Sequence, residues 1–168
     1  MPAPWSPTDL RSYEAALNVF DKKVKGAIAG VIKKTVEECY REIVDTSPWE
    51  TGSYISSHRI GINAVDGSDT VFSKENPTSK AAAQAQALTE LSKLTGLQDT
   101  DIVYISNSVG FSNENHYSWA ANIEYSGWNN KGPYLVFEKA ALMAINRIPQ
   151  YVQYVKGQGD KILDTLML

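Results

Sequence analysis

The stretch Ser47-Pro48-Trp49-Glu50-Thr51-Gly52 decides the fold, because a long helical pattern ends here and an extended pattern begins. The residue before a proline avoids the helical region of backbone angles, so Pro48 predicts the end of the helix. Glycine adopts backbone angles that other residues avoid, so Thr51-Gly52 predicts a sharp corner. We therefore expect a helix to turn into a sheet at this point.

The helix before this corner is predicted over residues 7–44, with Ser6 as its N-cap and Pro7 at its first position. Its apolar residues alternate in steps of three and four, as one helical face requires: Leu10, Tyr13, Leu17, Phe20, Val24, Ala27 and Val31. Gly26 and Gly30 each cost about 1 kcal/mol relative to alanine, so the prediction is one long helix, with a bend or break near these glycines as the alternative. Such a helix is longer than one compact domain needs, which predicts that part of it lies against a neighbouring chain.

After the corner, alternation of Tyr54, His58, Ile60 and Ile62 predicts a strand over residues 53–64. Asn76-Pro77 predicts the start of a helical insertion over 76–96, which Gly96 ends. The run Ile102-Val103-Tyr104-Ile105 is apolar on both faces and predicts a central strand.

A second motif lies about seventy residues after the first, in Trp119-Ala120-Ala121-Asn122-Ile123-Glu124-Tyr125-Ser126-Gly127. We read 116–126 as a helical turn flanked by extended chain, followed by a loop that carries Trp128. Pro133 then predicts the start of the last core helix, and Pro149 its end or a kink. Gly157-Gln158-Gly159 predicts a hinge before an apolar tail that docks on its own fold or on a partner.

These elements predict an α+β fold, in which a long N-terminal helix and a C-terminal helix pack on a small, mostly antiparallel sheet with a helical insertion between strands. The predicted organisation is an arm over 1–5, a single domain over 6–156 and a tail over 157–168.

Composition narrows the class of protein. The 168 residues are 43% hydrophobic and carry a formal net charge of −3, which does not favour a nucleic-acid binder. Cys39 is the single cysteine, so neither an internal disulfide nor a cysteine-based zinc site is possible within the chain. No apolar run approaches the length of a membrane span, and the first residues do not resemble a signal peptide. We expect a protein that is made in a cytoplasm, with no membrane partner.

Few residues suggest chemistry. His58 and His116 are the only histidines, and we expect both to be structural or solvated rather than catalytic. Glu114, His116 and Glu124 lack a known ligand spacing, so no metal site is predicted. No phosphate-binding glycine loop is present. The sequence therefore predicts no enzyme, no cofactor and no catalytic residue, with Cys39 as a buried structural thiol.

Two surface features leave alternatives open. The lysines of the first helix favour a charged helix face, with DNA contact as the alternative: Lys22, Lys23, Lys25, Lys33 and Lys34. Trp119, Trp128 and Tyr125 are interface anchors or pack on the domain's own sheet. Glu124 is expected to pair with a basic residue or to cap a neighbouring backbone.

The two motifs together resemble those of the tail-completion (head–tail joining, or neck) proteins of long-tailed bacteriophages. Pro48-x-x-Thr51-Gly52-x-x-Ile55 is similar to that family's Pro-x-x-Thr-Gly-x-Leu corner, with the aliphatic residue one position late. Trp119 to Gly127 is similar to its Tyr-Ala-x-x-Val-Glu-Tyr-Gly motif. Here Trp119 replaces the first tyrosine, and Ser126 stands at the usual glycine position. A loop, a proline and a helix rich in small residues follow in both.

The resemblance implies a structural virion protein that forms a homo-oligomeric, typically hexameric, ring at the phage neck. Its implied partners are the head-side connector and the tail terminator or tail tube, with double-stranded DNA passing through the channel without specific binding. The motif and interface residues that this implies are Pro48, Thr51, Gly52, Trp119, Ala120, Glu124, Tyr125, Gly127, Trp128 and Pro133. A tail terminator is the nearest alternative; a small hydrolase and a DNA-binding adaptor are the alternatives of other classes.

Overall fold

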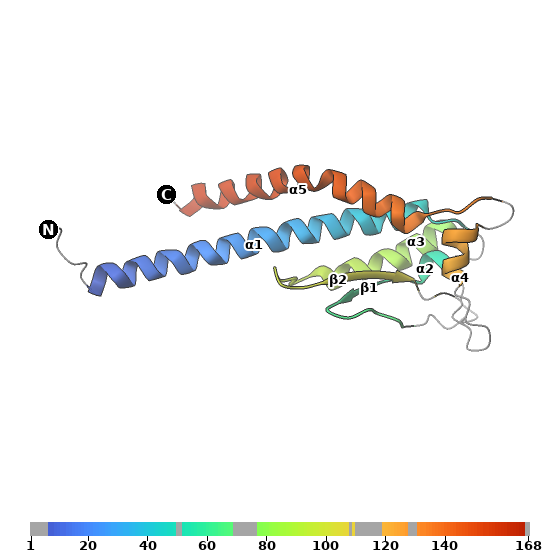
Figure 1. The fold of residues 1–168 in the computed structure, drawn as a ribbon, viewed down its shortest axis with the longest axis horizontal. Coiled ribbons are helices and arrows are strands. Elements are labelled where there is room, and N and C mark those ends of the chain that lie inside the picture. Colours follow the sequence, from blue (N-terminus) through green and yellow to red (C-terminus); the bar gives the residue numbers. More distant parts are fainter. Residues whose placement is uncertain are drawn as a thin grey trace.

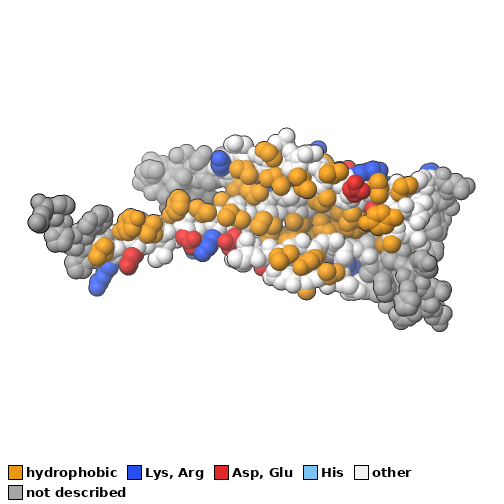
Figure 2. All heavy atoms as spheres, viewed as in Figure 1, with side chains coloured by type: hydrophobic (Ala, Val, Ile, Leu, Met, Phe, Trp, Pro, Cys, Tyr) orange, Lys and Arg blue, Asp and Glu red, His pale blue; other side chains and the backbone are white. Residues whose placement is uncertain are grey.

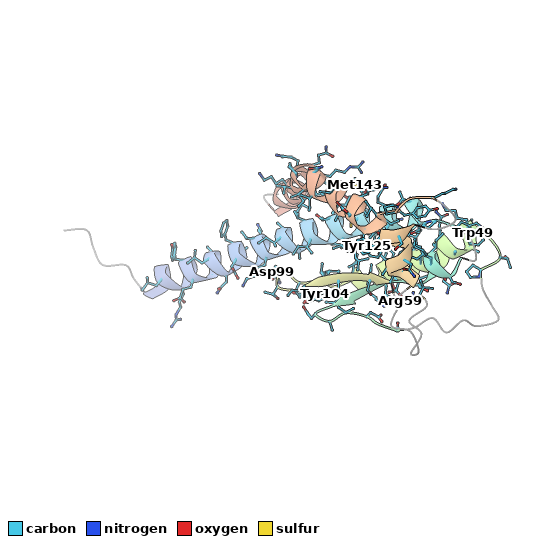
Figure 3. The ribbon with its side chains drawn as sticks, turned by 45° about the vertical axis from the view of Figure 1, so that its right-hand side comes forward. Trp49, Arg59, Asp99, Tyr104, Tyr125 and Met143 are labelled. Atoms are coloured by element: carbon cyan, nitrogen blue, oxygen red, sulfur yellow. The ribbon has the colours of Figure 1, made fainter. Side chains whose placement is uncertain are left out.

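A computed structural model describes residues 7–49, 52–68, 77–107, 109, 119–127 and 131–166, with side chains described within 10–157 of these ranges except that of Trp119. Two long helices dominate it, α1 (Pro7–Thr46) and α5 (Val136–Leu166), which run side by side in opposite directions (Figure 1). A two-stranded sheet and the shorter helices lie against the C-terminal part of α1, whereas its N-terminal part projects past the sheet (Figures 1 and 3). The α+β class and its two packed helices are confirmed.

Helix α1 is continuous over 40 residues, which confirms the single long helix and excludes a break at Gly26 and Gly30. Two glycines cost about 2 kcal/mol together, which the backbone hydrogen bonds of a long helix offset. At Gly30 an added Cβ would lie 3.5 Å from the Val155 methyl carbons, an ordinary contact distance, so α5 lies close to α1 at this point. The helix ends before Pro48, as predicted, and the Ser47 N–H donates to the Ile43 carbonyl oxygen over 3.1 Å.

The corner after α1 differs from the prediction in one respect. Residues 53–56 form a single helical turn, α2 (Ser53–Ser56), and the strand starts only at β1 (His58–Ile62). Gly52 has φ 79°, a left-handed conformation that starts this turn, and the Ser56 N–H donates to the Gly52 carbonyl oxygen over 2.9 Å. The predicted strand is therefore correct only in its second half.

Strand β1 pairs in antiparallel fashion with β2 (Val103–Asn107), with Ile60 opposite Ile105. Because the sheet has two strands among the described residues, β2 is not the central strand that its apolar run predicts. Ile102, just before it, is 59% exposed. The edge of β1 that does not pair with β2 is also hydrogen-bonded, because the Ile60 N–H donates to the Glu90 carboxylate over 2.9 Å.

The helical insertion lies between the two strands, as predicted, and consists of α3 (Lys80–Leu88) and the 3-10 helix η1 (Thr89–Leu94). Its start is Lys80 rather than Asn76-Pro77, because the Ser79 hydroxyl caps it by accepting from the Ala82 N–H. The small residues Ala83 and Ala87 are buried against α1 and the sheet, in a core with Tyr40, Val44, Ile55, Ile60 and Leu94.

The second motif forms α4 (Trp119–Ala121) and a π-helical turn, η2 (Asn122–Ser126), which confirms a helical turn at this place. Helix α5 begins at Val136 and not at Pro133, which lies in a non-helical segment. Pro149 lies inside α5 without ending it, and the helix continues through Gly157-Gln158-Gly159, where we expected a hinge. A second core, with Ile43, Val136 and Ala140, holds α5 against α1. The side chains of the apolar tail lie outside the described residues.

Candidate functional site

The two sequence motifs meet in the folded chain through a buried hydrogen bond. The Tyr54 hydroxyl, from α2, donates to the Glu124 carboxylate, from η2, over 2.5 Å. Both residues are buried, with exposures of 6% each. Burial, together with this hydrogen bond, raises the pKa of Tyr54 well above its ordinary value, so the phenol stays protonated and donates. The bond ties the corner after α1 to the turn before α5.

Glu124 also fixes the start of α5. Its carboxylate accepts from the Phe137 N–H over 3.4 Å, in the first turn of that helix, where the helix dipole favours a negative charge. Its backbone carbonyl oxygen accepts from the Leu135 N–H over 3.3 Å. Of the two roles expected for Glu124, capping a neighbouring backbone is therefore the one that the structure confirms.

His58 forms the centre of a second buried network. Its Nε2 lies 2.8 Å from the Ser47 hydroxyl and its Nδ1 lies 2.9 Å from the Asn107 amide nitrogen. Asn107 is oriented by two other contacts, since its Nδ2 donates to the Tyr54 carbonyl oxygen over 2.7 Å and its Oδ1 accepts from the Val109 N–H over 3.0 Å. His58 Nδ1 therefore accepts a hydrogen bond, and the proton of the neutral ring lies on Nε2.

A serine, a histidine and an asparagine in line resemble a hydrolase triad, but the direction of the hydrogen bonds is reversed. In a triad the histidine accepts the serine proton. Here His58 Nε2–H donates to Ser47, whose hydroxyl donates in turn to the Ile43 carbonyl oxygen over 2.6 Å. Ser47 and His58 are 1% and 0% exposed, so a substrate does not reach them. The arrangement locks the end of α1 to the sheet.

The surroundings of His58 keep it neutral. Three aromatic rings surround it edge-on, those of Tyr54, Phe137 and Tyr40, at centroid distances of 5.0, 5.6 and 6.5 Å. Burial, with a smaller effect from the neighbouring Arg59 charge, lowers the pKa of His58 to about 3. His58 is thus a packed structural histidine, as the sequence suggests. His116, the other histidine, lies outside the described residues.

The remaining residues of the first motif shape the corner. Trp49 lies over Gly52, where an added Cβ would come within 2.7 Å of the indole ring, so the close approach requires glycine. Trp49 is nevertheless 39% exposed, at the end of the body where α1 ends (Figure 3). Pro48 follows α1, and Thr51 lies outside the described residues.

In the second motif, Ala120 is buried, whereas Tyr125 is 73% exposed on the short helical segment beside the start of α5 (Figure 3). Gly127 has φ 80°, and a Cβ there would lie 1.9 Å from the Lys131 carbonyl oxygen. Pro133 is exposed. Trp128 and the side chain of Trp119 lie outside the described residues. For both, an interface anchor and a residue packed on the chain's own sheet stay the two predicted alternatives.

The largest unusual surface is apolar. Along the N-terminal part of α1, five large side chains without a polar group lie on one face and are 41% to 65% exposed: Leu10, Leu17, Phe20, Val24 and Ile28, called the projection stripe below. Tyr13 lies on the same face and is 54% exposed. On α5, Leu142, Ile145 and Ile148 are 55%, 59% and 37% exposed, and with the exposed Pro149 they form the outer stripe. Figure 2 shows hydrophobic side chains gathered along both helices. Exposed apolar surface of this extent marks interaction sites.

The lysines of α1 are partly neutralised. Lys25 contacts Asp21 and Lys34 contacts Glu38, each at 2.7 Å. Lys22, Lys25 and Lys33 line an open groove of about 520 Å³ beside η1, which Asp21 and Asp99 also line. This mixed charge agrees with a charged helix face better than with a phosphate-binding surface.

Other predicted features are less prominent. Cys39 is half-buried between α1 and α5, and burial raises the pKa of its thiol, which makes it a weak nucleophile. Among the described residues, no three His, Cys, Asp or Glu side chains gather closely enough to hold a metal ion. None of the described helices has the length and apolar character needed to cross a membrane.

Sequence reasoning missed the partners that organise these networks. Ser47 and Asn107 hold His58, and Glu90 holds the edge of β1, yet none of these three side chains was assigned a role. Their positions carry a weak local signal, because each is a polar residue at or beside the end of an element. The pairing itself depends on contacts 11 to 49 residues apart in the sequence.

No protein-family model, no curated protein and no solved structure matches the chain.

Proposed function

We propose that this chain is a structural subunit of a phage neck, assembling with copies of itself into a ring between the capsid connector and the tail. The observation that carries the proposal is the projection stripe, five large apolar side chains exposed on a helix that extends past the sheet (Figures 1 and 2). Such a surface is costly in water unless another protein covers it. A self-assembling subunit provides that cover.

The polar residues support the same proposal. The resemblance rests on the corner at Pro48 and the motif around Glu124, and the Tyr54–Glu124 hydrogen bond joins these two regions inside the fold. The residues that would be first candidates for chemistry, His58 and Ser47, are buried and serve to connect elements. The motifs thus act as scaffold, while the exposed surface is apolar and suited to contact other subunits.

The overall charge is compatible with a DNA channel. Attraction to phosphates comes from lysine and arginine, and the chain has 16 of these against 19 acidic residues. A ring with this balance lets DNA pass without holding it.

Inactivation of the gene in its phage tests the proposal. We expect DNA-filled capsids and complete tails that fail to join, and we expect the purified chain, added to such a lysate, to restore joined particles. Electron microscopy of the lysate measures both. Negative-stain images of the chain with its connector partner should show rings.

Two outcomes would contradict this role. Normal joined particles without the chain would remove it from the neck. Tails of uncontrolled length would instead assign it to the tail terminator.

A further inference from the structure

The projection stripe and the outer stripe are two apolar surfaces on different helices of one chain. The projection stripe repeats with the heptad spacing of a coiled-coil seam, with Leu10, Leu17 and Val24 at one core position and Phe20 at the other. From Leu10 to Ile28 it runs roughly 27 Å at 1.5 Å per residue. The outer stripe covers two turns of α5 on a face other than the one packed on α1.

The chain's own described elements leave the projection stripe exposed. The part of α1 that packs on the sheet and on α5 is its C-terminal half, through residues such as Tyr40 and Ile43. Helix α5 approaches α1 closely at Gly30, yet Ile28 and Val24 remain 46% and 41% exposed. Among the described residues, none covers this surface, so it is open to a partner.

The projection stripe is a poor partner for itself. Glu14 and Asp21 occupy the position that flanks the seam on one side. Asp21 is paired with Lys25 of its own helix, and Glu14 carries the charge that a partner meets. In an antiparallel pair this acidic flank faces its own copy. In a parallel pair, none of the residue pairs that flank the seam joins opposite charges: Asp9 lies opposite Glu14, Ala16 opposite Asp21, and Lys23 opposite Ile28.

Helix α5 offers the complementary charge. From Lys139 to Lys156 it contains no acidic residue and three basic ones, Lys139, Arg147 and Lys156. Arg147 lies 3.8 Å from Glu38 of its own α1, so Lys139 and Lys156 are the charges that meet the acidic flank of the projection stripe. Such complementarity selects partners and register. The outer stripe at the centre of this stretch supplies the apolar contact.

We propose that the projection stripe of one copy packs against the outer stripe of α5 of another copy. This contact rests on the proposed function, because it needs several copies of the chain in one assembly. It adds to that function the two surfaces through which the copies meet. It extends the helix-on-helix packing already present between α1 and α5 within each chain.

Disulfide cross-linking of the full chain tests the contact. In a Cys39→Ala background, Leu17→Cys and Ile145→Cys are made as separate variants, mixed in equal amounts and oxidised. We expect covalent dimers that contain one chain of each kind, identified by mass spectrometry. Val19→Cys, mixed with Ile145→Cys, is the matched control, because Val19 is 55% exposed on the same helix but lies outside the stripe.

A cross-link in the Leu17→Cys variant alone, at a yield equal to the mixture, would overturn the proposal in favour of α1 pairing with α1. An equal yield from the Val19→Cys control, or no product at any protein concentration, would also overturn it.

A second pair of variants measures the same contact without cysteines. Phe20→Lys should raise the dissociation constant of self-association by about 30-fold or more, the change that corresponds to about 2 kcal/mol at an interface anchor. Val19→Lys should leave it within about twofold. Light scattering measures association, and circular dichroism confirms that both variants stay folded.

These results separate the contact from the role in the phage. Rings that form without the Leu17–Ile145 cross-link would refute the contact while the neck function stands. A cross-linked pair in a protein that is dispensable for joining heads to tails would support the contact and refute the function.

Discussion

At the junction of the two motifs, buried polar groups form hydrogen bonds with partners that are distant in the sequence. Tyr54 contributes in three ways: its hydroxyl binds Glu124, its carbonyl oxygen accepts from Asn107, and its ring packs on His58. Because each of these groups is buried, removal of one partner leaves another without compensation. Stability should therefore respond strongly to single changes here.

Tyr54→Phe removes the hydroxyl that donates to the buried Glu124 carboxylate. We expect the free energy of unfolding to fall by about 1–3 kcal/mol, the cost of a buried acceptor left unpaired. Urea denaturation at neutral pH measures it. Tyr125→Phe is the control, because Tyr125 is 73% exposed, and it should change stability by less than about 0.5 kcal/mol. Equal effects of the two changes would show that the buried bond contributes nothing.

His58 should make the protein less stable in mild acid. Its pKa is about 3 in the folded chain and near 6.5 when unfolded, so the unfolded chain binds the extra proton between these values. The contribution is complete above pH 6.5 and is lost as the pH falls toward 3, by about 1.4 kcal/mol per pH unit. Urea denaturation between pH 7 and 5 measures this slope.

The matched control for that slope is the other histidine. His58→Gln should flatten the slope, whereas His116→Gln should leave most of it. Nuclear magnetic resonance gives an independent check, since the His58 ring signals should not titrate above pH 5. A His58 signal that titrates near pH 6.5 would contradict the buried, neutral ring.

At the scale of elements, helices continue through residues that disfavour them locally. Gly26, Gly30 and Pro149 all lie inside continuous helices. At Gly30 and Pro149 the packing of α1 on α5 outweighs the penalty of a single residue, whereas at Gly26 the backbone hydrogen bonds of the continuous helix offset it. The corner shows the opposite case, because the alternation of Tyr54, His58, Ile60 and Ile62 predicts a strand although a helical turn occupies its first residues.

Gly26→Ala should stabilise α1. A Cβ at this position meets nothing within 4 Å, so the gain in helix propensity of about 0.5–1 kcal/mol is not opposed by a clash. Thermal unfolding followed by circular dichroism measures it. Gly96→Ala is the contrasting variant, because φ is 81° there, and it should lower stability. A loss of stability in Gly26→Ala would show that α1 is not helical at this residue.

Gly127→Ala should disrupt the connection between η2 and α5. The added Cβ would lie 1.9 Å from the Lys131 carbonyl oxygen, at a positive φ, and we expect a loss of about 2 kcal/mol or more. Gly132→Ala, where nothing lies within 4 Å, is the control within the same connection. Denaturant unfolding of the two variants measures the difference. Equal unfolding midpoints would contradict the close approach of Gly127 to the Lys131 carbonyl oxygen.

On the scale of the whole molecule, the sequence predicts the class of fold and the presence of both long helices, because these follow from local periodicity. The sequence also predicts the helical insertion between the strands and gives capping as one of two expected roles for Glu124. The sequence could not predict that Ser47 and Asn107 would hold His58, since no local pattern states which distant polar groups meet. The two-stranded sheet likewise follows from tertiary pairing, not from the apolar run of β2.

Hydrogen exchange should separate the two halves of α1. The C-terminal half is packed against the sheet and α5, whereas side chains over residues 10–28 are largely exposed. An unsupported helix opens readily, so amides of residues 10–26 should exchange much faster than those of 36–46 in the isolated chain. Assembly should slow exchange in the first segment. Uniform protection along α1 before assembly would contradict an uncovered projection.

The unbroken course of α1 has a mechanical consequence. A straight helix of 40 residues is a rod of roughly 60 Å, anchored at one end by the Tyr40 hydroxyl, which lies 3.0 Å from the carbonyl oxygens of both His58 and Ala87. A sideways force on the N-terminal end of α1 is transmitted along the helix to the Tyr40 contacts, so a subunit bound at that end would exert a force on the sheet. Mechanical load between the subunits of an assembly would then reach the core of each subunit.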